Sequence, residues 1–242
     1  MNGRRLLRRP RIALALALLL VAGFAGPARA DDDAPAAFDR RGIYLGGGMR
    51  LDQIGGVLDG ESYAYGEQFF AVIPKVDPGG TFEISLASLA TYGGLVATYS
   101  GGRHDAEWLG DAFTARVSDI DFDFRVSAYP RSPVQPHAIV GFGFKRLAVD
   151  DAAVTPAGVD DAVFRGFSWD LGLGASVALL PQLLLDVSAI RAFRTYRNIA
   201  SGSDEALSFR GSLDAQGWSV RAGLLFRLAT LAPQRARPDE PF

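Results

Sequence analysis

The stretch that decides the fold is Phe167–Leu179, FSWDLGLGASVAL. Every second residue is apolar, and the residues in between are small or polar. Side chains alternate between the two faces of a β-strand, whereas helical spacing would not separate the two kinds so cleanly. The stretch therefore predicts a strand with one apolar face, made of Phe167, Trp169, Leu171, Leu173, Ala175, Val177 and Leu179.

The same alternation recurs along the chain from Gly42 onward. In the stretch 183–198 the alternation is interrupted at Ile190-Arg191, and a β-bulge there is one explanation. Counting every segment with this period predicts eight strands. The clear ones besides Phe167–Leu179 are 118–129, 137–149 and 216–228, and the weaker ones are 42–51, 81–90, 95–107 and 183–198.

The connections between these strands alternate in length. Gly93-Gly94, Pro130–Pro133 and Pro181-Gln182 are short and contain turn residues. The others are longer and more polar, and cover 52–80, 109–115, 150–163 and 201–215. Short turns at one end and long loops at the other predict an antiparallel up-and-down barrel.

The composition of the two faces indicates which of them points outward. A soluble barrel keeps its apolar face inside, whereas a membrane barrel reverses this arrangement. Here the polar face is rich in Gly and Ser, which suits a narrow lumen, and the strands reach the ~9–11 residues needed to cross the hydrocarbon. Trp169, Tyr129, Trp218 and Phe226 could form interfacial girdles. We therefore expect an all-β, eight-stranded transmembrane barrel and hold a soluble barrel as the less favoured reading.

The first thirty residues have the pattern of a secretory signal peptide. Five arginines lie within residues 1–11, residues 12–26 are apolar, and Ala28-Arg29-Ala30 fits a cleavage site after Ala30. These thirty residues hold six of the 25 basic residues and none of the 27 acidic ones, so the remainder carries a net charge of −8. Such a charge argues against nucleic-acid binding. We expect a signal peptide over 1–30, a lead-in over 31–41, a barrel over 42–228 and a flexible periplasmic tail over 229–242.

Three segments carry a resemblance to a known family: Gly42–Gly48 as a first strand, Pro136–Phe144 as a Gly/aromatic strand, and Gly217–Leu228 as a closing strand. The chain from Gly42 to Leu228 resembles the small outer-membrane β-barrels of Gram-negative bacteria, of the opacity-protein and OmpA-barrel type. The resemblance implies an outer-membrane location, contact with lipid and lipopolysaccharide, and insertion by the barrel-assembly machinery. In such barrels the aromatic-bearing last strand is the assembly signal, which assigns that role here to Trp218 and Phe226. Unlike them, this chain runs on past its last strand.

Charged residues on the polar faces predict an ion-pair network inside the barrel. The row Asp119, Asp121 and Asp123 is its most conspicuous part, with Arg194 among its candidate partners. A metal site would need converging oxygen ligands, so paired lumen charges are the favoured reading. The expected members are Arg50, Glu83, Asp119, Asp121, Asp123, Arg125, Lys145, Asp170, Arg221 and Arg227.

The sequence offers little for catalysis. The absence of cysteine excludes disulfides and thiolate sites, and only two histidines are present. Ser100, His104 and Glu107 could suggest a lipid A deacylase of the same barrel type, but the His-x-Ser arrangement of those enzymes is missing. We expect no enzyme activity, no cofactor and a monomer. The expected role is structural, adhesive or protective with a side-chain-filled lumen, and the alternatives are an enzyme acting on outer-membrane lipid and a small-solute pore.

Overall fold

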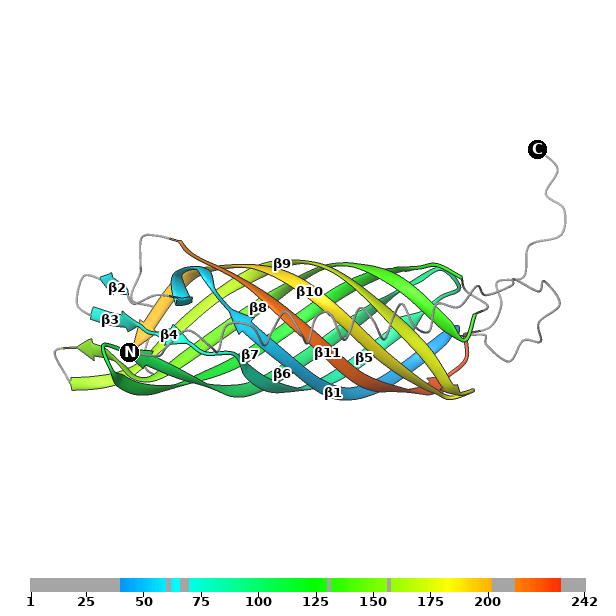
Figure 1. Ribbon diagram of the computed structural model, residues 1–242, viewed down its shortest axis with the longest axis horizontal. Coiled ribbons are helices and arrows are strands. Elements are labelled where there is room, and N and C mark those ends of the chain that lie inside the picture. The colour runs from blue at the N-terminus through cyan, green and yellow to red at the C-terminus, as the bar shows by residue number, and fades with distance from the viewer. Residues whose placement is uncertain are drawn as a thin grey trace, which may run out of the picture.

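The computed structural model describes residues 40–59, 62–65, 70–129, 132–155, 158–201 and 212–231 (Figure 1). Eight long antiparallel strands form the wall of a barrel. None of the helical segments among the described residues is long and apolar enough to cross a membrane as a helix. The wall strands are β1 (Gly42–Ile54), β5 (Gly79–Leu89), β6 (Gly93–Trp108), β7 (Asp111–Ser127), β8 (Val134–Thr155), β9 (Gly158–Leu180), β10 (Leu183–Ser201) and β11 (Leu213–Ala229).

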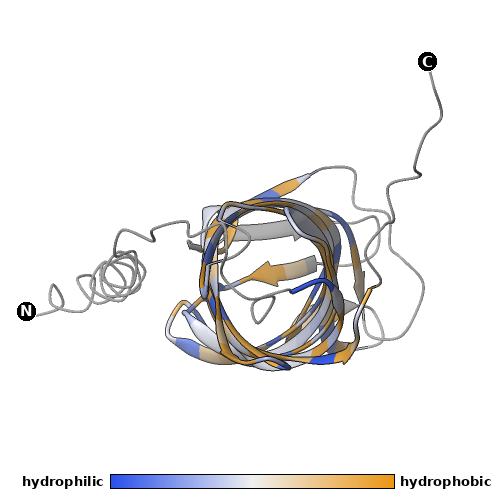
Figure 2. Ribbon diagram, turned by 90° about the vertical axis from the view of Figure 1, so that its right-hand side faces the viewer, coloured by the Kyte–Doolittle hydropathy of each residue, from blue (hydrophilic) through white to orange (hydrophobic). Residues whose placement is uncertain are grey.

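The barrel closes because the first and last wall strands pair with each other. Along the seam between β1 and β11, Met49 lies opposite Ala222 and Arg50 lies opposite Arg221. Every other wall strand pairs with its neighbours in sequence, so the ring has no free edge along its length. Figure 2 shows this closed ring viewed along the barrel. The predicted eight-stranded antiparallel barrel is confirmed.

The two ends of the barrel differ. At the turn end, β5–β6, β7–β8 and β9–β10 are joined across residues 90–92, 128–133 and 181–182. At the loop end, β6 and β7 are joined by Leu109-Gly110 alone, and both residues have positive φ angles (49° and 91°), as a two-residue hairpin requires.

Two of the predicted long loops, 109–115 and 150–163, are wrong: most of their residues extend the hairpins β6–β7 and β8–β9. Here the buried inner positions are apolar, such as Val149 and Ala162, while Asp150 and Asp161 stand toward solvent. The apolar face has changed sides, so the outward-apolar alternation that marked the strands elsewhere is lost.

A bulge does not explain the interrupted alternation at Ile190-Arg191, because the pairing of β10 with β9 has no register shift there. Alternation continues through this part of β10, with Ile190 buried in the lumen and Arg191 on the outer wall. The Arg191 guanidinium lies 5.3 Å from the ring centroid of Trp218, so a cation–π contact and not a bulge explains an arginine at that position. The register shifts later, between Tyr196 and Asn198.

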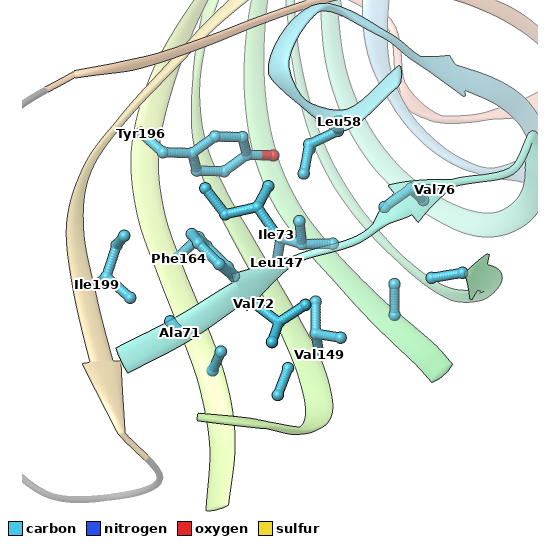
Figure 3. Packing of buried hydrophobic residues seen from close by; sticks show 14 of the residues in the cluster. Leu58, Ala71, Val72, Ile73, Val76, Leu147, Val149, Phe164, Tyr196 and Ile199 are labelled. Atoms are coloured by element: carbon cyan, nitrogen blue, oxygen red, sulfur yellow. The ribbon is translucent and has the colours of Figure 1, made fainter. Parts of the chain in front are cut away.

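The connection between β1 and β5 folds back into the mouth of the barrel at the loop end. It contains the short helix η3 (Gly56–Asp59) and the strands β2 (Ser62–Tyr65), β3 (Phe70–Ile73) and β4 (Lys75–Val76). β3 pairs with the far end of β8, and β4 pairs with β6. We call η3, β3 and β4 the plug, because their apolar side chains pack inside the wall (Figure 3).

Candidate functional site

The lumen is filled by three layers of side chains. The layer at the loop end is apolar and includes the plug, and the middle layer is charged. The layer at the turn end is apolar and contains fewer side chains than the loop-end layer. The charged layer contains most of the residues that the sequence marked.

The aspartate row of β7 forms one side of the charged layer. Asp119, Asp121 and Asp123 are all buried, at 2% exposure or less. Arg50 reaches them from β1, three places away in the ring, and donates to Asp119 at 2.7 Å and to Asp121 at 2.9 Å. It also donates to Asp52 at 2.7 Å. One arginine therefore ties two separate parts of the wall together across the lumen.

Two further cations complete this bracing. Arg221 of β11 donates to Asp123 at 2.6 Å and to Asp121 at 3.1 Å. Lys145 of β8 donates to Asp121 and, at 3.2 Å, to Asp119. Each carboxylate of the row thus has at least one cationic partner, which a buried charge requires.

Glycines on β8 make room for the aspartates. In the register, Gly143 lies opposite Asp121 and Gly141 lies opposite Asp123. A Cβ atom on either glycine would collide with the carboxylate of its partner. The Gly-rich inner face seen in the sequence therefore has a direct cause in the crowding of the charged layer.

Not all the marked residues join this layer. Arg125 lies nearer the turn end and pairs with Asp186 at 2.7 Å, where Asp186 also accepts from Ser176. Arg227 lies at the turn end, where it donates to the Tyr44 hydroxyl at 2.9 Å and stacks over that ring. The sequence grouped it with the network by phase alone, which does not give height in the barrel.

One member of the charged layer, Asp52, was missed by sequence reasoning. Asp52 and Arg194 pair at 3.4 Å, and both are buried. Asp52 had been assigned to a loop, although it continues the inward phase of Arg50 by two residues, a signal that could have found it. Arg194 was named as a candidate partner of the aspartate row, and in the structure it pairs with Asp52.

Carboxylates outnumber cations in the described part of the charged layer. Glu83 lies 3.3 Å from Arg221, but Asp170, which is 1% exposed, has no hydrogen-bond partner on either oxygen among the described residues. No group of three or more His, Asp or Glu side chains in the described ranges is arranged to hold a metal ion. The acids are Asp52, Glu83, Asp119, Asp121, Asp123 and Asp170, and the cations are Arg50, Lys145, Arg194 and Arg221.

Apolar side chains close the lumen on both sides of the charges. At the loop end, Leu58, Ile73 and Val76 of the plug pack against inward residues of the wall, including Phe164 and Tyr196 (Figure 3). At the turn end the closing layer consists of Tyr44, Ala87, Leu89, Val96, Leu184 and Leu225.

A small cavity lies between the charged layer and the turn-end layer. It lies beside Glu83, Arg125, Asp186 and Arg221 and has a volume of about 20 Å³, which is room for about one water molecule. Arg40, just before β1, seals the turn end by donating to the backbone carbonyls of Ser132, Pro133 and Ser176, and burial lowers its pKa to about 10.

The residues of the deacylase reading are not brought together. Ser100 and His104 both face the lumen but lie four residues apart on β6, which separates them by about 13 Å at the rise of a strand. Glu107 faces outward. His137 is buried near the turn end, 4.0 Å from Asp186, and is remote from Ser100 and His104.

The outer wall is apolar along most of its height. Large hydrophobic side chains occupy the outward positions of every wall strand, for example Met49 (58% exposed), Phe82 (71%) and Leu173 (66%). The two residues of the expected assembly signal, Trp218 and Phe226, are among them, at 44% and 51% exposure. Apolar outside and charged inside is the pattern of a membrane barrel.

Solved structures show the same architecture. The chain matches Neisserial surface protein A with a TM-score of 0.51 and 14% identity, over 76% of this chain and 96% of that one. The fold is that of an eight-stranded outer-membrane barrel. The sequence-based resemblance is confirmed at this level.

Two further structures are similar over comparable lengths. Ail, the attachment invasion locus protein of Yersinia pestis, matches with a TM-score of 0.42 and 12% identity, over 77% of this chain and 99% of that one. The outer membrane protein AlkL matches with a TM-score of 0.42 and 12% identity, over 79% and 93%. No protein-family model and no curated protein sequence matches the chain.

Proposed function

We propose that this chain is an integral outer-membrane protein that acts through its loop end at the cell surface, in a structural, adhesive or protective role, and that its lumen does not conduct. The observation that carries the proposal is the combination of an apolar outer wall with a lumen closed by three layers. The wall gives it a place in a bilayer, and the closed lumen leaves the loops as the part that can meet a partner.

The outer wall supports the membrane location. Its exposed Leu, Ile, Phe and Trp side chains would each be costly in water, because apolar surface costs about 25 cal/mol per Å² when it is hydrated. Patches of this extent are rare on soluble monomers. In hydrocarbon the same surface needs no protein partner, which supports a monomer.

Cysteine labelling tests the location and the orientation. The chain has no native cysteine, so D111C at the loop end and T91C at the turn end each introduce a single thiol at an exposed position. We expect a membrane-impermeant maleimide to label D111C but not T91C on intact cells, and to label both after lysis. Labelling of neither on intact cells, or recovery of the protein in the soluble fraction, would contradict the proposal.

The closed lumen argues against the pore alternative. A conducting path would have to pass the plug, the ion pairs of Arg50 and Arg221, and the turn-end layer. We expect no stepwise conductance when the purified protein is inserted into planar bilayers. Reproducible unitary currents would favour the pore.

A deletion that shortens the loop end tests the surface role. Shortening the β8–β9 hairpin by deletion of residues 152–161 should leave the barrel assembled and weaken adhesion or resistance to envelope stress in cells that carry it. Lipid A mass spectra from cells with and without the protein should be identical. A mass change that depends on the protein would instead favour the enzyme alternative.

A further inference from the structure

Four arginines stand on the outer wall toward the loop end of four consecutive strands. Arg103 of β6 lies directly opposite Arg116 of β7, and Arg146 of β8 lies directly opposite Arg165 of β9. Arg116 and Arg146 are diagonal neighbours, since Arg116 pairs with Ala148, two residues beyond Arg146. All four are exposed. We call these four residues the arginine cluster.

The cluster lies immediately beyond the apolar wall. The next outward residue toward the turn end is Phe144 on β8 and Phe167 on β9. One outward position further down, Phe142 stacks on Phe122 with 5.3 Å between ring centroids and lies 6.3 Å from Trp169. An aromatic surface ending in arginines is what the boundary between hydrocarbon and headgroups requires, because guanidinium groups reach outward while their stems stay apolar.

Three of these four arginines have no acidic partner among the described residues. Arg116 binds Asp161 and, at 2.8 Å, Asp150. For Arg103, Arg146 and Arg165 no carboxylate lies within 4.0 Å in the parts of the chain that the structure describes. Their charges are therefore available to an anion from outside the protein.

We propose that Arg103, Arg146 and Arg165 of the arginine cluster bind the phosphate groups of a phosphorylated glycolipid in the outer leaflet, with the acyl chains lying against Phe144 and the aromatic side chains below it. The proposal rests on the proposed membrane location. Arginine suits this ligand because its planar fork donates two parallel bonds to one phosphate.

The surroundings favour a lipid over a soluble polyanion. Beyond the cluster, the outward positions of β6 are acidic and exposed, at Asp105 and Glu107. A long soluble polyanion approaching from the loop end would meet these negative charges first. A lipid phosphate reaches the arginines from the side, along the wall.

Binding in neutral detergent micelles tests the proposal without depending on cell location. The probes are diphosphoryl lipid A and the same lipid with its phosphates removed, and the variants are R146Q/R165Q and, as matched control, R116Q. We expect R146Q/R165Q to weaken binding of the phosphorylated probe about 30-fold, from roughly 1 kcal/mol for each arginine at an anionic surface. R116Q should change it less than threefold, since Asp150 and Asp161 already hold that side chain. R146K/R165K keeps both charges without the fork and should fall between the wild type and R146Q/R165Q.

Four results would overturn the proposal. They are wild-type affinity of R146Q/R165Q, an equal loss in R116Q, equal binding of the dephosphorylated lipid, and arginine-dependent binding of dextran sulfate or inorganic pyrophosphate without binding of lipid A. Gel mobility of unboiled samples shows whether each variant is a folded barrel. Failure of the cysteine labelling with intact micelle binding would contradict the membrane location alone.

Discussion

At the scale of single residues, Asp121 is the centre of the charged layer. It is fully buried and accepts bonds from Arg50, Lys145 and Arg221, which belong to three different strands. Asp121→Leu would leave these cations without their shared partner, so we expect a loss of about 3–5 kcal/mol in the free energy of unfolding. Asp105→Leu, on the exposed wall, is the control and should barely change the urea midpoint. Equal midpoints for the two variants would show that the network does not stabilise the barrel.

Asp170 offers the opposite case within the same layer. It is as buried as Asp121, yet no described residue donates a hydrogen bond to it. A buried carboxylate without a donor costs stability, and its neutral amide costs less. We therefore expect Asp170→Asn to leave the urea midpoint unchanged or to raise it, whereas Asp121→Asn should lower it. A fall of similar size in both variants would mean that Asp170 has a stabilising partner.

The sequence predicted which charged residues face the lumen better than it predicted which of them pair with one another. Period-two phase placed Asp119, Asp121 and Asp123 on the polar face, and the structure shows them inside. Phase could not show that Arg50 and Arg221 reach the row across the lumen while Arg227 lies at the turn end. Height and distance across a barrel depend on strand tilt and closure, which no single strand encodes.

At the scale of elements, the wall strands were predictable and the plug was not. Strands facing lipid must alternate, whereas the described residues within 56–76 form short elements, and the apolar residues of this Gly- and Pro-containing segment follow no regular period. Only the closed mouth of the barrel gives them a common surface. The loop-end parts of β8 and β9 were also missed. Beyond the apolar part of the outer wall, outward side chains no longer have to be apolar, so the alternation that predicts a strand is lost.

The plug should be separable from the wall. Ile73 is fully buried in the loop-end layer, and an ionised side chain there would be strongly unfavourable. The wall has its own hydrogen-bond ladders, so we expect Ile73→Asp to expose the β1–β5 connection to protease in outer-membrane fractions while the heat-modifiable barrel persists. Ile73→Val, which costs about 0.5–1.5 kcal/mol, is the control and should stay protected. Loss of the barrel itself in Ile73→Asp would show that plug and wall fold as one unit.

At the scale of the whole molecule, closure depends on β11. It joins β10 on one side and β1 on the other, so the ring forms only when this last strand is in place. The sequence could indicate the strand and its outward face, since one seam must close any up-and-down barrel. Pro233, Pro238 and Pro241 each lack the backbone N–H that a strand ladder needs, so the sequence predicts that the tail does not continue the strand; these three residues lie outside the described part of the chain.

Of the aromatic residues in this part of the chain, Phe226 fits the assembly signal by phase, and Phe242, which lies outside the described residues, does not. Phe226 lies on the outer face near the end of β11, opposite Leu45 of β1 and Leu183 of β10. Phe226→Asp places a charge against lipid, which costs less than the roughly 2–4 kcal/mol of a midplane Arg or Lys, and it also removes the aromatic group that the resemblance assigns to the assembly machinery. We expect no heat-modifiable barrel in unboiled outer-membrane fractions of this variant. Truncation after Leu231 should leave the barrel intact. If truncation prevents assembly and Phe226→Asp does not, the assembly signal lies at Phe242. Damage to the apolar wall alone would give the opposite result, because Phe226→Asp changes the wall and truncation after Leu231 does not.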